Sequence, residues 1–325
     1  MSWQQFLDDL GAQRNAGGEA SHFTAGGNAS VIVGDHLAVI SVRGPETEKF
    51  LQGQLTCDLH PVFAGQWRLA MHLDLKGRGQ HSYIVLAATD GVDLLTSQQR
   101  VDDALAALKK YALFSKVTLT RQPEQVALLL REPAADNALH GVPLPAEVGH
   151  CSHGNNSTLA RMRVDTLLLL TSQQGARSLL NHYTVAELGG VDDWRRDEIE
   201  SGIGHILPGG EGLWLPQALN YDLLDGVNFK KGCYLGQEVV ARMHFKGKMK
   251  QRMQHLRWQV GITAAPGSTL RDADGQAVGE LVCAASGTQH TDALVVLRLD
   301  HQGALHLNEQ PLDWQPIELP YPLPA

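Results

Sequence analysis

The pattern of apolar and polar positions predicts many short strands interrupted by helices. Two apolar runs, at 31–33 and 37–42, flank Gly34-Asp35 and predict a β-hairpin. Apolar residues recur at helical spacing between 97 and 114, and Ser97 is the candidate N-cap of that helix. The same reasoning predicts helices at 3–10, 46–55, 173–182 and 192–201, and strands at 68–75, 80–88, 92–96, 116–121, 125–130, 158–163 and 166–171.

The pattern changes after Phe245. Short apolar runs are separated by Gly, Asp and Pro turns, which predicts a small β-barrel or β-sandwich. At 325 residues the chain has room for about two domains. We therefore predict an α+β protein with a body at 1–245, formed by two intertwined subdomains, and an all-β domain at 246–325. The predicted strands of that domain lie at 253–260, 277–284, 293–299 and 304–307.

Composition narrows the class of protein. Apolar residues make up 43% and charged residues 19% of the chain, which excludes global disorder. No apolar stretch is long enough for a membrane span, and the acidic, polar N-terminus does not have the pattern of a signal peptide. The four cysteines are scattered without a CxxC pair, as expected for free thiols in a reducing compartment. These features predict a cytoplasmic protein.

The net charge of −8 conceals a local basic stripe. The window 230–257 contains eight Lys and Arg residues and a single acid, Glu238, so it carries +7 and the rest of the chain −15. A basic stripe on an acidic protein indicates a particular anionic partner, although a solvated helix and strand face would give the same pattern.

The densest cluster of chemically useful residues is NFKKGCYLGQEVVAR at 228–242. Cys233 precedes a predicted helix start and follows Lys231 by two positions, and both features favour a thiolate. Glu238 lies in the first turn of that helix, where it is favourable to the dipole. The alternative is a buried, inert cysteine, because free cysteines are commonly buried. No second cysteine or HxxxH lies nearby, so no metal site is predicted.

KGCYLGQE at 231–238 resembles the signature K-x-C-x-x-G-Q-E of the YgfZ family, folate-binding proteins related to the glycine-cleavage aminomethyltransferases. The resemblance extends to other blocks in the expected order, across most of the first 250 residues. These blocks are GPETEKFLQGQLTCD at 44–58, the KGR turn at 76–78, LKKYALFSKV at 108–117, the longer match at 216–242, and FKG with a following Arg at 245–252.

The resemblance implies an aminomethyltransferase-like body of antiparallel sheets and helices that binds tetrahydrofolate. It also implies a role in tRNA thiolation and in the assembly or repair of iron–sulfur enzymes, which would include tRNA-modifying partners. Trp194 falls where the family has a tryptophan near the folate, and an indole ring can stack on a pterin or benzoyl ring; core packing is the alternative. The functional motif would consist of Cys233 and Lys231, in a loop formed with Tyr234, Gly236, Gln237 and Glu238.

Two departures from the family pattern affect function. A second aromatic position of the family, seven residues before the glycine of the GPE turn, is Leu37 here, which keeps apolar contact but loses stacking. True aminomethyltransferases have an acid just after the turn at 76–79, where this chain has Gln80, His81 and Ser82. Without a carboxylate to move a proton, we expect no aminomethyl transfer.

Three functions remain open from the sequence. The first is a folate-binding accessory factor for tRNA modification and iron–sulfur enzymes, with no catalytic turnover of its own expected. The second is a folate-dependent one-carbon transferase or demethylase. The third is a tRNA-binding adaptor that uses the basic stripe at 230–257. The cysteine loop favours the first function.

Overall fold

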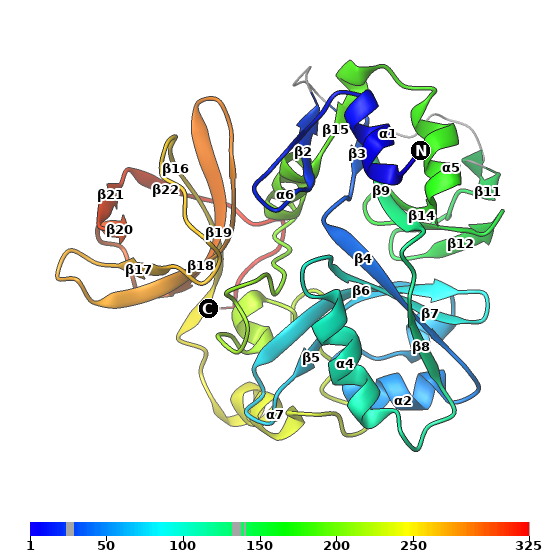
Figure 1. Ribbon diagram of the computed structural model, residues 1–325. Helices are drawn as coiled ribbons and strands as arrows, with labels where there is room; N and C mark the ends of the chain where they lie inside the picture. The colour runs from blue at the N-terminus through cyan, green and yellow to red at the C-terminus, as the bar shows by residue number, and fades with distance from the viewer. Residues whose placement is uncertain (24–28, 132–137, 140, 325) are drawn as a thin grey trace. The chain divides into compact units, whose positions relative to one another are not determined.

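The computed structural model describes residues 1–23, 29–131, 138–139 and 141–324 (Figure 1). Residues 24–28 of the predicted Gly-, Ala- and Ser-rich stretch that ends at Ser30 lie outside this description. In the described ranges no helix is both long and apolar enough to cross a membrane. The helices are α1 (Trp3–Asp9), α2 (Thr47–Gln54), α3 (His60–Phe63), α4 (Val101–Tyr111), α5 (Gln173–Leu180), α6 (Val191–Glu200) and α7 (Gln237–Lys246), with short 3₁₀ turns η1 (Val185–Glu187) and η2 (Pro216–Leu219).

The strands form five sheets. Two of them are two-stranded, β1 (Ala12–Arg14) with β2 (Ala20–Phe23) and β10 (Ala138–Leu139) with β11 (Val142–Pro143). A six-stranded sheet has the order β12 (Cys151–Gly154), β13 (Ser157–Arg161), β14 (Thr166–Ser172), β9 (Gln125–Arg131), β3 (Val31–Val33), β15 (Leu188–Gly189). A five-stranded sheet has the order β5 (Trp67–Leu73), β6 (Gly79–Ala88), β7 (Gly91–Ser97), β4 (Leu37–Arg43), β8 (Thr118–Arg121).

The chain divides into two compact units, and both are assembled from separate segments. The first consists of Met1–Gln52, Asp58–Arg68 and Tyr83–Trp194, and the second of Gly53–Cys57, Leu69–Ser82 and Arg195–Ala325. The division therefore passes through β5, β6 and α6. The boundary predicted after residue 245 falls inside the second unit, just before its first barrel strand.

The core of the first unit lies on one face of the six-stranded sheet. Alternate residues of β3, β9 and β14 point to that face, as the two-residue period of a strand requires. Helices α1 and α5 cover it with the apolar side of each helix, so that the sheet and helices bury one another. The sheet residues are Val31, Val33, Leu128, Leu130, Leu167 and Leu169, and the helix residues are Trp3, Phe6, Leu7, Ala176, Leu179 and Leu180.

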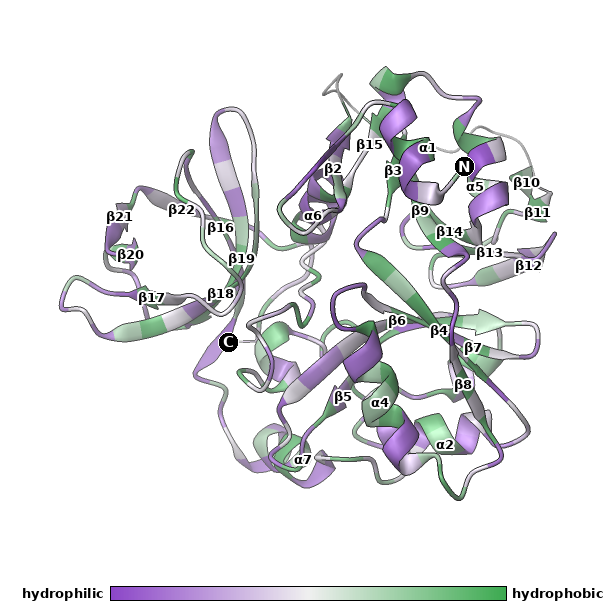
Figure 2. Ribbon diagram, viewed as in Figure 1, coloured by the Kyte–Doolittle hydropathy of each residue, from purple (hydrophilic) through white to green (hydrophobic). Residues whose placement is uncertain are grey.

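The predicted hairpin of 31–33 with 37–42 is wrong in its pairing. Both strands exist, but β3 pairs with β9 and β15, whereas β4 pairs with β7 and β8 in another sheet. The three residues of β3 are all buried, and β4 is hydrophobic over almost its whole length (Figure 2). A strand buried on both faces has no alternation that would identify its partner.

Helix α4 also differs from its prediction at the N-terminus. Its N-cap is Arg100, without a side-chain hydrogen bond, and Ser97 is instead the last residue of β7. The carbonyl of Ser97 accepts the N–H of Arg100 at 3.0 Å. Asp102 and Asp103 in the first turn and two lysines in the last turn match the helix dipole, so charge stabilises a helix that has no side-chain cap.

The second unit contains the predicted all-β domain. Seven strands form a nearly closed antiparallel barrel (Figure 1), which confirms the α+β class with a C-terminal β-barrel. The pattern missed the short strands β17, β21 and β22, which are only three or four residues long. The order is β21 (Gln310–Leu312), β20 (Leu305–Leu307), β17 (Thr269–Arg271), β18 (Ala277–Ser286), β19 (His290–Arg298), β16 (Gln251–Gln259), β22 (Trp314–Ile317).

A buried ion pair joins β16 to the loop after η2. Arg252 donates to both carboxylate oxygens of Asp222, at 2.9 and 2.8 Å, and both side chains are less than a tenth exposed. Arg252 also donates to the carbonyl of Gln217 and to Oδ1 of Asn220, so this desolvated cation has several hydrogen-bond partners. Removing one member of such a pair leaves the other charge buried and poorly compensated.

We expect Asp222→Ala to lower the free energy of unfolding by about 3 kcal/mol or more, because Arg252 would keep its charge without its carboxylate. Urea denaturation followed by circular dichroism measures this loss. Asp300→Ala is the matched control, because Asp300 pairs with Arg298 at the surface, where both side chains are at least half exposed. Equal denaturation midpoints for the Asp222→Ala and Asp300→Ala proteins would contradict the expectation.

Candidate functional site

The loop at 228–236, which carries the predicted motif and is called the motif loop below, is fixed at its start by Asn228. The side-chain oxygen of Asn228 accepts the backbone N–H groups of Lys230 and Lys231, at 2.7 and 2.9 Å. Its own N–H donates to the carbonyl of Thr56 at 2.9 Å. An asparagine that bonds backbone groups two and three residues ahead stabilises a tight turn. The chain direction is therefore fixed before Cys233 is reached.

Lys231 holds the middle of the motif loop to the segment Gly53–Cys57. Its Nζ donates to the carbonyls of Leu55 and Cys57, at 2.7 and 2.6 Å. Near the end of the loop, the N–H of Leu235 donates to the carbonyl of Gly53 at 3.2 Å. Hydrogen bonds from a charged donor are stronger than neutral ones. The motif loop is therefore attached to one short segment at its start, middle and end.

Tyr234 packs beneath the motif loop. Its residue is 6% exposed, and the ammonium of Lys231 lies 5.1 Å from the centre of its ring, within the range of a cation–π contact. Burial raises the pKa of Tyr234, so the phenol is neutral at physiological pH. Among the described residues its hydroxyl has no hydrogen-bond partner.

Two glycines bring the KGR turn against the end of the motif loop. Gly236 has φ +78°, and a Cβ built on it would lie 2.5 Å from the carbonyl oxygen of Asp74 and 3.0 Å from Cα of Gly77. Gly77 has φ +74°, and a Cβ there would lie 3.0 Å from Cβ of Val239. Both positions thus require glycine for conformation and for space. The blocks at 44–58, 76–78 and 216–242, separate in sequence, meet here.

Cys233 is exposed, whereas Cys57 and Cys283 are buried and Cys151 is intermediate. The buried, inert cysteine considered from the sequence is therefore not what this position holds. Helix α7 begins at Gln237, with Gly236 as its N-cap, so Cys233 lies upstream of the helix and not in its first turn. Glu238 is exposed in that first turn, as predicted.

The strand after the KGR turn contains buried histidines. His81 and His72 are each about 5% exposed, and their rings stack with centroids 6.3 Å apart. Burial lowers the pKa of His72 to about 4, so its ring is neutral at neutral pH. Gln80 donates to a carboxylate oxygen of Asp74 across the turn, at 3.5 Å. Asp74 is a carboxylate beside positions 80–82 that the linear comparison did not reveal.

Trp194 and Leu37, the two predicted folate positions, both lie at the turn after β3 in the first unit. Trp194 is 1% exposed, and its ring meets His36 edge-on with centroids 5.4 Å apart. It packs directly behind Gly34, where an added Cβ would lie 2.8 Å from Cζ3 of the indole. Gly34 and Leu37 line a cavity of about 620 Å³. Trp194 therefore supports the wall of a cavity that Leu37 faces.

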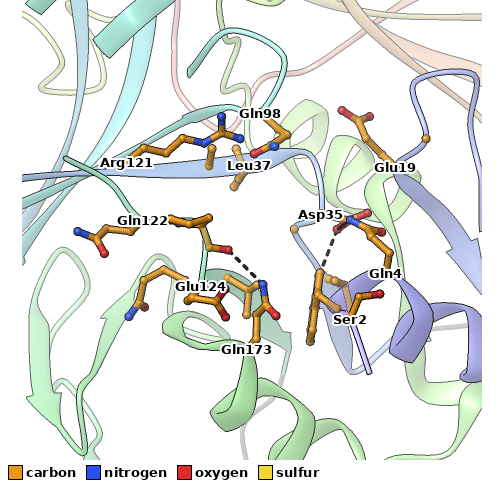
Figure 3. Close-up of a pocket in the computed structure, with 18 of the residues that line it drawn as sticks. Ser2, Gln4, Glu19, Asp35, Leu37, Gln98, Arg121, Gln122, Glu124 and Gln173 are labelled. Carbon is orange, nitrogen blue, oxygen red and sulfur yellow. Dashed lines mark hydrogen bonds between the residues drawn. The ribbon is translucent and has the colours of Figure 1, made fainter. Parts of the chain in front are cut away.

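The cavity is largely polar. Figure 3 shows Leu37 beside Gln98 and Arg121, with Gln173 across from them. Gln173 donates to the carbonyl of Pro123 at 3.1 Å, which fixes its amide. Primary amides can donate and accept at once, so this lining suits a heterocycle with both kinds of group on its edge.

Sequence reasoning missed the groups that hold the motif loop. They are the backbone carbonyls of Leu55, Thr56 and Cys57, and a carbonyl has no residue-type signature. The available signal was the resemblance of the block at 44–58, which contains this segment. The structure brings the motif residues together in the second unit and Trp194 with Leu37 in the first.

The basic stripe separates into two groups of cations. Arg252 and Arg257 form ion pairs with Asp222 and Asp292, and Lys231 bonds the carbonyls described above. The other five cations of the window are exposed. They are Lys230, Arg242, Lys246, Lys248 and Lys250.

Comparison with known proteins identifies the class. The model of the glycine cleavage system aminomethyltransferase T from Bartonella henselae superposes with a TM-score of 0.77 at 18% identity, covering 97% of this chain and 96% of that one. The chain therefore has the aminomethyltransferase T fold. It belongs to the YgfZ family, which confirms the resemblance inferred from the sequence.

Two relatives show the membership. The tRNA-modifying protein YgfZ of Sodalis glossinidius is 34% identical over 238 residues, 72% of this chain and 73% of the relative. That of Serratia proteamaculans is 34% identical over 229 residues, 69% of each chain. No family model matches the chain.

We expect Gly236→Ala to destabilise the protein by about 1–3 kcal/mol and to reduce its function in the cell, because the new methyl group would collide with the Asp74 carbonyl in a backbone conformation that disfavours alanine. Thermal unfolding and complementation of a deletion strain measure the two effects. Gly232→Ala is the control in the same loop, since a Cβ there meets nothing within 4 Å. If both variants behave like the wild type, the contact between the two turns does not constrain the loop.

Proposed function

We propose that this protein is a folate-binding accessory factor that supports tRNA modification, with Cys233 as its reactive group. Family membership and the aminomethyltransferase T fold support tRNA modification and a folate-related site in general. The observation that carries the finer proposal is an exposed thiol on a loop held to neighbouring backbone at three points. The clients would include iron–sulfur tRNA-modifying enzymes.

A reactive group benefits from such a support. The hydrogen bonds of Asn228, Lys231 and Leu235 fix the backbone on either side of Cys233 and leave the sulfur open to a partner. A thiol presented in this way loses little conformational entropy when it meets a client, so more of the interaction energy is available for binding. Lys231 would act as a positioning residue through the loop it holds.

Tetrahydrofolate carries one-carbon units when it is bound, and the cavity at Leu37 has features that fit it. Its volume of about 620 Å³ lies in the range of small-molecule sites. Gln98, Gln122 and Gln173 would match the donors and acceptors of a pterin edge, and Leu37 would contact the ring system. Arg121 would pair with a carboxylate of the glutamate tail in exchange for the highly exposed Asp102, which it now contacts at 3.0 Å.

A second candidate is a tRNA-binding adaptor. The observation that favours it is the group of five exposed cations in the window 230–257, on a chain whose net charge is −8. This reading is compatible with the first, because an accessory factor for tRNA modification could contact tRNA as well as its client enzymes.

Cys233→Ser is expected to abolish tRNA thiolation in a deletion strain while the melting temperature stays within a few degrees of the wild type, because serine is nearly isosteric and the position is exposed. Mass spectrometry of thiolated nucleosides and thermal melting of the purified variant provide the two readouts. Cys151→Ser, outside the motif loop, is the matched control and should keep full activity. A folded and fully active Cys233→Ser protein would mean that the thiol has no chemical role.

In calorimetric titrations with tetrahydrofolate, we expect Leu37→Ala to weaken binding about tenfold through lost apolar contact. Leu37→Trp should tighten binding by restoring an aromatic face. Trp194→Ala should weaken binding by loosening the wall at Gly34. Trp67→Ala serves as the control, since Trp67 belongs to the same unit and does not line the cavity. Unchanged affinity in both alanine variants at 37 and 194 would exclude this cavity as the folate site.

A further inference from the structure

The C-terminal half of α7 carries an exposed cluster of aromatic rings. His244 lies flat on Phe229, with ring centroids 3.7 Å apart and planes 12° apart. Phe245 meets His244 edge-on, with centroids 4.7 Å apart, and Phe229 at 6.2 Å. Phe245 is 67% exposed, and His244 is also at the surface. Burial in the core therefore does not explain this arrangement, because the ring that completes it remains in solvent.

The five exposed cations of the basic window lie on the same two stretches of chain. Lys230 directly follows Phe229, and Arg242 and Lys246 belong to α7 with His244 and Phe245. Lys248 and Lys250 follow the end of the helix. We call Phe229, His244, Phe245 and these five cations the aromatic–basic face. The single acid of the window, Glu238, lies at the opposite end of α7.

This combination favours one kind of partner. Exposed cations attract any polyanion, but exposed rings add an attraction only for a partner that presents flat π surfaces. The bases of a duplex are stacked on each other and cannot lie on a protein ring, whereas the bases of a single strand can. An acidic protein surface would satisfy the cations and gain no comparable stacking on Phe245.

We propose that the aromatic–basic face binds a single-stranded segment of RNA, with an unpaired base stacked on Phe245 and the surrounding cations on the phosphates. The choice of RNA rests on the proposed role in tRNA modification; the single-stranded form follows from the exposed rings. Phe229 and His244 would act by supporting Phe245, whose orientation they fix through their edge-to-face contacts.

The test is fluorescence anisotropy of the full chain with a labelled 12-nucleotide single-stranded RNA and with a fully paired hairpin of the same composition. Phe245→Ala should raise the Kd for the single strand about 5- to 150-fold, the range expected for loss of one base–ring stack. Phe245→Trp should retain or improve binding. Phe114→Ala is the matched control, because Phe114 is 99% exposed and lies outside the face, and it should bind like the wild type.

A second arm separates charge from stacking. Lys246→Gln with Lys248→Gln should lower the slope of log K against log salt by about 1.4, that is, about 0.7 for each lost phosphate contact on a single strand. Phe245→Ala should lower affinity at every salt concentration and leave this slope unchanged. Thermal melting of each variant confirms that the helix and its unit remain folded.

Several outcomes would overturn the proposal. They are no measurable binding of the single strand at low salt, equal affinity of Phe245→Ala and wild type, equal losses in Phe245→Ala and Phe114→Ala, and tighter binding of the hairpin than of the single strand. The last result would indicate a purely electrostatic surface. None of these results depends on tetrahydrofolate titration or on the activity of Cys233→Ser, so the failure of one proposal can be distinguished from the failure of the other.

Discussion

The attachment of one ammonium group to two backbone carbonyls is the interaction on which the candidate cysteine site depends. Lys231 bonds Leu55 and Cys57 across 176 and 174 residues of sequence. A hydrogen bond from a charged donor contributes about 1.5–3 kcal/mol, which is enough to offset the side-chain entropy lost by an ordered lysine. With this attachment the motif loop has one conformation, and Cys233 is presented from it. A role in positioning the loop explains the place of Lys231 in the motif without any direct contact with sulfur.

The same site shows how side-chain and backbone constraints reinforce one another. Asn228 fixes the entry to the loop by side-chain hydrogen bonds, and Gly236 fixes the exit by the absence of a side chain. Gly77 meets this exit from the opposite turn, so the two turns occupy a space in which neither position can carry a methyl group. Three separate sequence blocks are thereby combined into one site. The charges of the basic window divide in a similar way, into cations that hold the fold together and cations that face solvent.

Local features of the fold could be predicted from the sequence, and long-range ones could not. Most helices and the longer strands lie where periodicity placed them, and α7 begins at Gln237 as expected. The pairing of β3 and β4 was wrong because both strands are buried throughout, and their partners are chosen by packing far along the chain. For the site, the motif residues were identifiable by their resemblance to a family. The carbonyls that bind Lys231 and the pairing of Arg252 with Asp222 depend on folded geometry alone.

The second unit takes two of its segments, Gly53–Cys57 and Leu69–Ser82, from the first third of the chain. During synthesis these segments leave the ribosome long before the residues that complete their unit. At about 5–20 residues per second, the 176 residues between Leu55 and Lys231 correspond to a wait of roughly 9–35 s. Apolar residues of β5, such as Met71 and Leu73, have no complete core during that time. Order of synthesis thus makes the nascent chain dependent on protection until its last 130 or so residues are translated.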